Sequence, residues 1–295
     1  MESVTLRAET KEGLPLKAVY CPGKGMNLVS YRWGDIELIA QDTLPLFEDH
    51  CAGLGALIGP HFHHRRKEVI PLVPHEEHFL HIARVRARGV AEPFSHGIAR
   101  YAPWQHEVDG NRIVATLEGK SEWNGVALKE LEGQNFRMQY TAELTEGGLA
   151  IDYSIISDSD SLVGLHYYYT LVGGKGAVMA KVKNQYLDQG QTKQIPSSWN
   201  YDTRMGLLNW DCIDEADYGF HPFADPLNGS IALKTGSYFL QVQYSCTNAE
   251  NQWQLYHPRG ASFVCIEPMS AANPRKPQLT VSGLHVDISV SAVVE

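Results

Sequence analysis

Apolar and polar residues alternate with a period of two along much of this chain. Three segments, residues 148–158, 237–246 and 284–294, carry large apolar side chains at every second position. Because successive side chains of a β-strand point to opposite faces, this pattern predicts strands with one buried face. Shorter stretches of similar character predict further strands within residues 28–39, 111–118, 135–144, 163–172 and 261–268.

Turn signals separate several of these predicted strands. The pairs Asp109-Gly110, Gly147-Gly148 and Asn228-Gly229 are typical of tight β-turns. Many short strands and few helices predict an all-β protein built as a large antiparallel sandwich or barrel. No repeat, low-complexity tract or linker interrupts the pattern, so we expect a single domain over residues 1–295.

Three segments do not alternate. Residues 74–89 are the one helix candidate, with Phe79, Ile82 and Ala83 able to share a face. Residues 42–80 and 188–232 are long for structureless loops and rich in aromatics, His and Pro. We expect both to be ordered loops at the rim of a site.

Composition excludes several classes of protein. The formal net charge of −9 and the absence of a long basic cluster disfavour nucleic acid as a partner. The first residues lack the pattern of a signal peptide, and no apolar run is long enough to span a membrane. The five cysteines are scattered and never spaced as C-x-x-C, which favours reduced thiols over disulfides or a thiolate zinc site. We therefore expect a cytoplasmic protein with no membrane partner.

Three short stretches carry candidate chemistry. His96 and Arg100 lie four residues apart in a turn-like segment, and His166 shares a strand face with Tyr168. Glu267 directly follows the apolar residues 263–266, so its carboxylate should be partly desolvated and need a partner or a task. Each residue also has a plain structural interpretation, as a hydrogen-bonded core histidine or an exposed residue at a strand end.

Taken in order, these stretches resemble motifs of the aldose 1-epimerase (galactose mutarotase) family. "SHGIARYAPW" is similar to the family's His-Gly-x-x-Arg segment with its following Trp, and "LHYYYTL" to its His-Pro-Tyr-Phe strand. "CIEPMS" is similar to its late Glu-Pro motif, and "CIDEADYGF" to its Asp-containing loop. The chain departs from the family at Tyr167, which replaces the proline, and in "GPHFHHRR", where the family has an Arg-bearing loop.

The resemblance implies a fold, an activity and a set of site residues. It implies a large antiparallel β-sandwich of the galactose mutarotase-like (supersandwich) type, without a cofactor, that interconverts the α and β anomers of a hexose or of a hexose 6-phosphate. Glu267 would be the base, His166 the acid to the ring oxygen, and His96 a hydrogen-bond donor. The residues that would bind the sugar are Arg100, Asp214 (or Asp217 if the loop is shifted), Arg65 (or Arg66), Trp104 and Tyr168.

This chemistry needs one base and one acid and no metal. A proton leaves the C1 hydroxyl while another reaches the ring oxygen, so the ring opens and can close on the other face. With reference pKa values of about 4.3 and about 6.5, a Glu would be mostly ionised near neutrality and a His mostly neutral. His166 would then need an acidic neighbour or the substrate to act as an acid.

Two other functions fit parts of the sequence. A sugar-binding β-sandwich without catalysis would keep the fold but would not need His96, His166 and Glu267 together. A cupin-like metal enzyme would use His61, His63 and Glu68 of "GALIGPHFHHRRKE" as ligands, but the second half of the cupin pattern is missing downstream.

Overall fold

The computed structural model describes residues 2–63, 65–223, 225–247 and 250–293, which form a β-sandwich. Within these ranges, twenty strands share one hydrogen-bonded system, and their pairings are antiparallel. The first sheet runs, in order, through β6 (Gln105–Asp109), β7 (Arg112–Glu118), β10 (Phe136–Thr145), β11 (Gly148–Ser157), β22 (Val281–Ser291), β19 (Phe239–Cys246), β18 (Asn228–Thr235), β13 (Gly176–Asp188), β16 (Leu207–Asp211) and β15 (Tyr201–Asp202). The second runs through β1 (Val4–Glu9), β2 (Pro15–Cys21), β3 (Asn27–Trp33) with β4 (Ile36–Glu37), β5 (Gly55–Ile58), β12 (Gly164–Thr170), β21 (Phe263–Met269), β20 (Gln252–His257), β17 (Ala216–Pro222), β13 and β14 (Gln191–Gln194).

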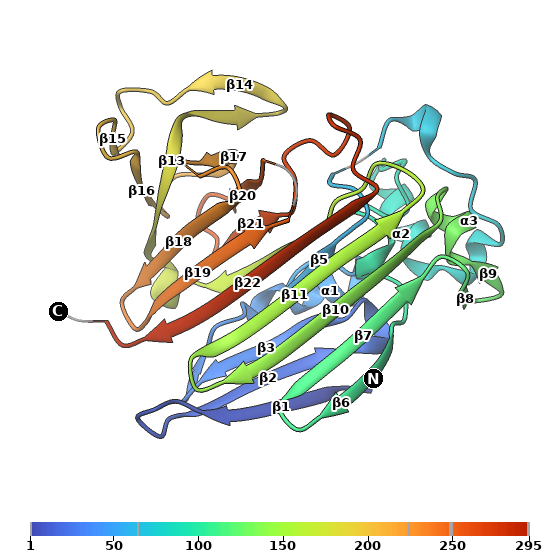
Figure 1. Ribbon diagram of the computed structural model, residues 1–295, viewed down its shortest axis with the longest axis horizontal. Helices are drawn as coiled ribbons and strands as arrows, with labels where there is room; N and C mark the ends of the chain where they lie inside the picture. Colours follow the sequence, from blue (N-terminus) through green and yellow to red (C-terminus); the bar gives the residue numbers. More distant parts are fainter. Residues whose placement is uncertain (1, 64, 224, 248–249, 294–295) are drawn as a thin grey trace.

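One long strand belongs to both sheets. The first half of β13 pairs with β16 and β18 in the first sheet, and its second half pairs with β17 and β14 in the second. Its pairing with β17 is irregular between Val182 and Tyr186. Figure 1 shows β13 running from beside β18 toward the β14 and β17 region. A bend of this kind lets a strand turn the corner between packed sheets.

The core lies between the inner faces of the two sheets, as the alternating pattern predicted. Ile151, Tyr153, Leu240 and Val286 are at most 1% exposed. Burial of each such side chain contributes about 1.5–3 kcal/mol to folding. The hydroxyl groups of two buried tyrosines contact each other there, since those of Tyr140 and Tyr167 lie 3.1 Å apart. The predicted all-β antiparallel sandwich is confirmed.

Local predictions were confirmed in part. Asp109-Gly110 and Gly147-Gly148 lie at the hairpin turns β6–β7 and β10–β11. Asn228-Gly229 was wrongly predicted as a turn, because both residues begin β18. There the missing side chain of Gly229 makes room for the ring of Tyr244, to which an added Cβ would lie 2.3 Å away.

The two long segments behave differently. Residues 42–80 contain α1 (Leu44–His50), β5 and short 3₁₀ turns, whereas residues 188–232, predicted as a loop, contain part or all of β13 to β18. That second prediction was wrong because strands such as β14 are exposed throughout and show no alternation.

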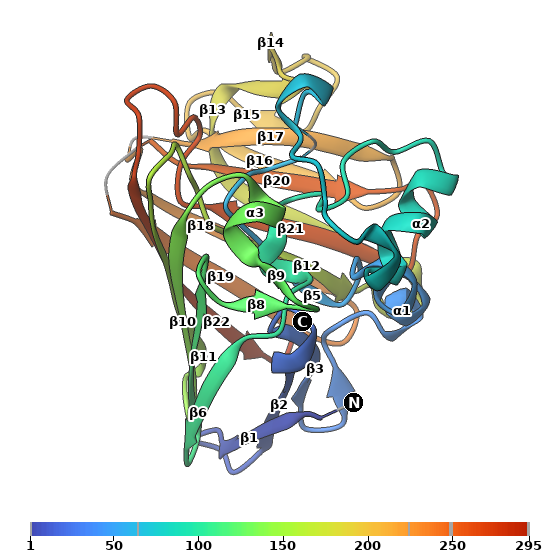
Figure 2. The same cartoon turned by 90° about the vertical axis from the view of Figure 1, so that its right-hand side faces the viewer.

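Short helices cover the outer side of the second sheet. The predicted helix is α2 (Leu80–Ala87), which buries Ile82 and Val85 while the expected Ala83 is exposed. In Figure 2, α1 and α2 lie on the side of β5 and β12 away from the first sheet, and α3 (Leu128–Glu132) follows the small β8 (Glu122–Trp123) and β9 (Val126–Ala127) pair. None of the helices in the described ranges has the length and apolar character needed to cross a membrane.

Candidate functional site

The candidate site lies on the outer face of the second sheet, where polar side chains form a row across four strands. Leu165, Tyr167 and Tyr169 of β12 point into the core, so His166 and Tyr168 point outward. Across the sheet, His166 pairs with Ala56 of β5, and Gln254 of β20 pairs with Glu267 of β21. The antiparallel register therefore places segments far apart in the sequence in one row.

His166 and Glu267 contact each other at the centre of this row. His166 Nε2 lies 3.3 Å from Glu267 Oε1, and the two residues are only 7% and 1% exposed. A buried imidazole and a buried carboxyl within hydrogen-bond reach are the acid–base pair that the sequence predicted to be functional. Their contact follows from the pairing of β12 with β21.

Burial changes the protonation of this pair. It raises the pKa of Glu267 well above its ordinary value, against the nearby charge of Arg100 and with help from Asp217. It lowers the pKa of His166 well below its ordinary value, and the charge of Arg100 lowers that pKa further. Both shifts favour the neutral forms of the two side chains, with a single proton on Glu267, over the ionised glutamate expected from ordinary pKa values.

His96 lies next to this pair, on a tight turn. Its ring lies 5.2 Å from that of His166, nearly perpendicular to it. The backbone of His96 has a φ of 63°, and Gly97 follows with a φ of 87°. A Cβ at Gly97 would lie 1.9 Å from the carbonyl oxygen of Gly59, so only glycine fits this close approach.

Hydrogen bonds fix the His96 turn to the segment after β5. The N–H of Gly59 donates to the carbonyl of His96 at 2.8 Å, and the N–H of His96 donates to the carbonyl of His63 at 3.1 Å. The N–H of His63 also donates to His96 Nδ1 at 3.2 Å. Because Nδ1 then acts as an acceptor, the proton of neutral His96 is assigned to Nε2, which becomes the donor.

Arg100 is buried close to His96, His166 and Glu267. Its Nε donates to the carbonyl of Leu57 at 3.1 Å, while its Nη2 is buried and has no hydrogen-bond partner among the described residues. Its charge acts on His96, His166 and Glu267. A buried guanidinium N–H without a partner is free to donate to an oxygen of a ligand.

A cavity of about 670 Å³ opens next to this row. Asp217 and Gln254 both line it, and Gln254 Nε2 donates to Asp217 Oδ1 at 2.6 Å. The size suits a small ligand, and amide and carboxylate groups are the partners that sugar hydroxyls need. The other lining residues are Phe62, His63, Leu187, Gln189, Gly190, His221, Gln252, Ala272 and Asn273.

The structure distinguishes between Asp214 and Asp217, the two aspartates that the sequence left as alternatives for binding the sugar. Asp214 is exposed in the turn between β16 and β17, whereas Asp217 lies on β17 and faces the cavity. Ala216 and Phe220 of the same strand are buried, so the alternation along residues 216–220 is the signal that favours Asp217. We correct the first choice, Asp214, accordingly.

The two aromatic residues predicted to bind the sugar, Tyr168 and Trp104, lie in different parts of the structure. Tyr168 is buried and stacks on His166 with ring centroids 5.0 Å apart. Trp104 instead lies in the core, where its Nε1 donates to the carbonyl of Ala99 at 2.9 Å and its ring contacts Tyr140 and Tyr153. The expected sugar-stacking role of Trp104 is not supported by this position between the sheets.

Arg65 supports the site indirectly, through ion pairs with Glu92 and Glu132. Its Nε and Nη2 donate to the two carboxylate oxygens of Glu92 at 2.9 and 3.0 Å, and its Nη1 lies 3.0 Å from Glu132 Oε1. Glu132 also accepts hydrogen bonds from His61 Nδ1 at 2.9 Å and from the N–H of Ile98 at 3.0 Å. We correct the assignment of Arg65 to the sugar, because its guanidinium is already engaged; Arg66, the alternative, is exposed.

The sequence analysis missed both Glu92 and Glu132. Their carboxylates tie the segment after β5 to the turn that carries His96 and so position that histidine. The available signal was the spacing of Leu128, Leu131 and Glu132, all buried on α3, which places the carboxylate on the apolar side of a helix.

We expect Glu132→Gln to destabilise the protein strongly. The substitution leaves the buried guanidinium of Arg65 with only one carboxylate, and breaking a buried ion pair typically costs about 3–5 kcal/mol. Urea unfolding should show a lower midpoint for this variant, and Glu130→Gln, an exposed position on the same helix, should match the parent. Equal midpoints for Glu132→Gln and the parent would contradict the supporting role of this network.

The residues of the cupin alternative do not come together. His61 is bound to Glu132, His63 packs on Phe62, and Glu68 is exposed in a 3₁₀ turn. In the described part of the chain, the one group of three close potential metal ligands is His166, Cys265 and Glu267. The predicted absence of a resident metal and of a cofactor stays a prediction.

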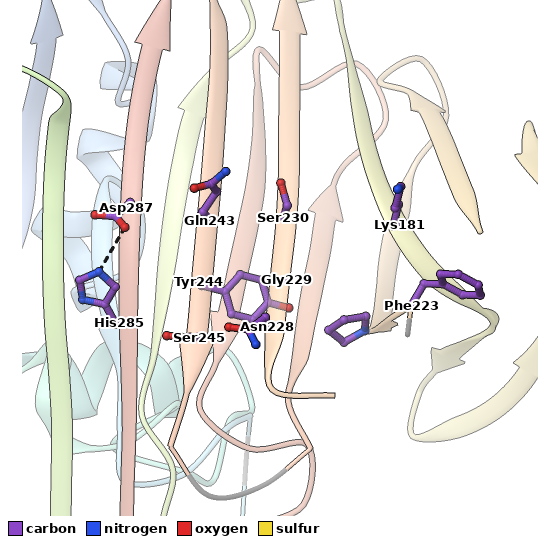
Figure 3. Close-up of a pocket in the computed structure, with 11 residues that line it drawn as sticks. Lys181, Phe223, Asn228, Gly229, Ser230, Gln243, Tyr244, Ser245, His285 and Asp287 are labelled. Carbon is purple, nitrogen blue, oxygen red and sulfur yellow. Dashed lines mark hydrogen bonds and ion pairs between the residues drawn. The ribbon is translucent and has the colours of Figure 1, made fainter. Parts of the chain in front are cut away.

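A second hollow, of about 440 Å³, lies on the outer face of the first sheet (Figure 3). His285 there contacts Asp287 at 3.2 Å and Asp152 at 2.8 Å. Burial lowers the pKa of His285, but the two aspartates outweigh this effect and raise it overall. Since this is an exposed ion pair and none of the motif residues lies there, we place the candidate site at His166 and Glu267.

Comparisons with known proteins agree with this architecture. No family model matches the sequence, and no curated protein matches it. Among solved structures, a protein from Synechocystis sp. PCC 6803 is 15% identical with a TM-score of 0.67, covering 99% of this chain and 97% of its own. A galactose mutarotase-like protein from Lactobacillus casei is 13% identical with a TM-score of 0.66, covering 98% of this chain and 100% of its own.

A third solved structure, an aldose epimerase homologue from C. elegans, is 13% identical with a TM-score of 0.65, covering 99% of this chain and 100% of its own. At such identities the likeness concerns the fold, and it extends over nearly the whole chain. The chain therefore has the galactose mutarotase-like fold that its four motifs predicted.

Proposed function

We propose that this protein is an aldose 1-epimerase that interconverts the α and β anomers of a hexose by general acid–base catalysis. The observation that carries the proposal is the buried contact between His166 and Glu267 beside a cavity lined by hydroxyl-binding groups. This chain has the galactose mutarotase-like fold, and the pair lies on the outer face of its second sheet. Buried groups with strongly displaced pKa values next to a cavity are typical of catalytic sites.

The single proton of the pair supplies both catalytic groups. When it moves from Glu267 to His166, it produces a carboxylate and an imidazolium at the same time. The carboxylate then takes the proton of the C1 hydroxyl, the bond between C1 and the ring oxygen breaks, and the imidazolium protonates that oxygen. After rotation about C1–C2, the same transfers in reverse close the ring on the other face and restore the pair.

His96 and Arg100 would stabilise the oxygens that change charge. The donor assigned to His96 Nε2 and the unpartnered Nη2 of Arg100 are both present before the sugar binds. Donors that are already oriented in a buried site need no reorganisation when negative charge develops. Asp217 and Gln254 would bind the remaining hydroxyls of the ring.

The charge of the cavity favours an unphosphorylated sugar. Among the described residues that line it there is no Arg or Lys, and Asp217 contributes a carboxylate. Arg65 is engaged by Glu92 and Glu132, and Arg275, another candidate partner for a phosphate, pairs with Asp160 at 3.2 Å. A phosphate group would therefore meet the carboxylate of Asp217 and no Arg or Lys among the described residues that line the cavity.

Polarimetry tests the proposal directly. Freshly dissolved α-D-glucose and α-D-galactose should reach their equilibrium rotation faster with the protein than without it, and glucose 6-phosphate should respond less. Binding of these sugars without any acceleration would instead favour the second candidate, a carbohydrate-binding sandwich without catalysis. We also propose that the protein works in the cytoplasm, where its five buried cysteines would stay reduced.

The rate should show a broad maximum with pH. Below the lowered pKa of His166 the pair gains a second proton and loses its base, so the acid limb should lie below the ordinary histidine range. Above the raised pKa of Glu267 the pair loses its only proton, so the carboxyl group sets the alkaline limb. Measurements of kcat/KM against pH check this; limbs at the ordinary His and Glu values would contradict the single-proton pair.

A further inference from the structure

A cysteine completes a group of three potential metal ligands at the acid–base pair. Cys265 lies two residues before Glu267 on the same face of β21, and it is paired across the sheet with Tyr168 of β12. The ligand atoms of His166, Cys265 and Glu267 all lie within 4.8 Å of one another, and all three residues are buried. The proposed proton transfers make no use of the thiol.

The donor types suit zinc and similar soft divalent ions. Imidazole, thiolate and carboxylate are the three donor classes that bind Zn²⁺, at about 2.0–2.3 Å in tetrahedral geometry. Such bond lengths separate two donors by roughly 3.3–3.8 Å. His166 Nε2 and Glu267 Oε1 are already 3.3 Å apart, so only modest side-chain adjustment is needed to bring in the thiol.

We propose that His166, Cys265 and Glu267 bind a zinc-class divalent cation reversibly, and that the bound ion inhibits the protein. The inhibition rests on the proposed function, because the ion would occupy the nitrogen and the carboxylate that the anomer interconversion requires. Binding itself does not depend on that function. The fourth coordination position would be left to a water molecule.

Local charge sets the expected strength of binding. On binding, the thiol and the carboxyl release their protons, and the resulting thiolate and carboxylate balance the charge of the ion. The nearby guanidinium of Arg100 opposes a cation, since its charge acts on all three ligands. We therefore expect an affinity on the order of micromolar, typical of a regulatory ion and weaker than a structural zinc site.

Selectivity follows from the same donors. Mg²⁺ and Ca²⁺ prefer oxygen ligands and larger coordination numbers, which a site of one carboxylate, one imidazole and one thiolate does not offer. We expect Zn²⁺, Cd²⁺ and Co²⁺ to bind, and Mg²⁺ and Ca²⁺ at the same concentration to have no effect.

Cobalt provides a readout that is independent of activity. Titration of the metal-free full-length protein with Co²⁺ should produce the near-ultraviolet absorption of a cobalt–thiolate bond, and Zn²⁺ should abolish it by competition. Cys265→Ala should not show this absorption. Cys212→Ala, which removes a buried thiol from the sandwich core, is the matched control and should behave as the parent.

Inhibition provides the second readout. Zn²⁺ should slow the polarimetric rate of the parent, and a chelator should restore it. Cys265→Ala should keep the basal rate and need at least about 10-fold more Zn²⁺ for the same inhibition, the smallest loss expected on removing a partner of a metal site. If the alanine variant fails to fold, Cys265→Ser, which keeps a small polar side chain, replaces it in both assays.

The outcomes separate the inference from the proposed function. A cobalt–thiolate absorption that requires Cys265, in a protein that does not accelerate anomer interconversion, would support the metal site and reject the proposed function. No such absorption in the parent, or equal absorption in the parent and Cys265→Ala, would overturn the metal site. Equal zinc sensitivity of the two proteins would overturn the inhibition.

Discussion

Glu267→Gln should lower the rate of anomer interconversion by about 100- to 10,000-fold, the range that general acid–base groups contribute. The amide keeps the shape of the side chain but cannot take the C1 proton or hold the single proton of the pair. Polarimetry at saturating sugar measures the loss. Glu130→Gln, on the exposed side of α3, serves as the control and should keep the parent rate.

The same substitution should leave the stability unchanged or higher at mildly alkaline pH. Burial raises the pKa of Glu267, so the folded state keeps a proton that the unfolded state releases once the pH exceeds the ordinary carboxyl value. That difference reduces the stability of the parent as the pH rises toward the raised pKa, and glutamine does not titrate. If Glu267→Gln folds and works at the parent rate, the base must be another residue.

Changing either histidine should separate two roles. His166→Asn should reduce turnover by about 100-fold or more while sugar affinity stays within about a few-fold, because an acid acts in the transition state. His96→Asn should weaken both affinity and turnover, since a donor to a sugar oxygen contributes before and during the reaction. Melting temperature, sugar affinity and rate should be measured for both variants.

Purely structural histidines would give a different pattern. Both substitutions would then lower the melting temperature and leave the rate per folded molecule nearly unchanged. That result would remove the catalytic assignment of the pair and favour a binding protein over an enzyme.

The alternating strands were the most predictable part of this protein. Alternation reports which face of a strand is buried, and it correctly placed Ile151, Leu240 and Val286 in the core. It does not report which strands pair. The contact of His166 with Glu267 depends on the pairing of β12 with β21, so only the resemblance to known motifs could suggest that the two residues act together.

The errors at the site have a common physical origin. A tryptophan in the core and a tryptophan that stacks on a sugar look alike in a sequence, and Trp104 is the former. A buried ion pair and a substrate-binding arginine also look alike, and Arg65 belongs to the former. In each case the deciding partner, Tyr153 for Trp104 and Glu92 for Arg65, lies more than 20 residues away along the chain.

The position of β22 has a consequence for how the chain reaches this fold. This strand, Val281–Ser291, lies inside the first sheet between β11 and β19, although β11 ends at Ser157, more than 120 residues earlier in the chain. During synthesis, the edges of β11 and β19 that pair with β22 must therefore stay unpaired until residues near 291 leave the ribosome. Unpaired strand edges and distant contacts slow folding and invite association between chains, so we expect this sheet to complete only after translation has passed β22 and to depend most on chaperones before then.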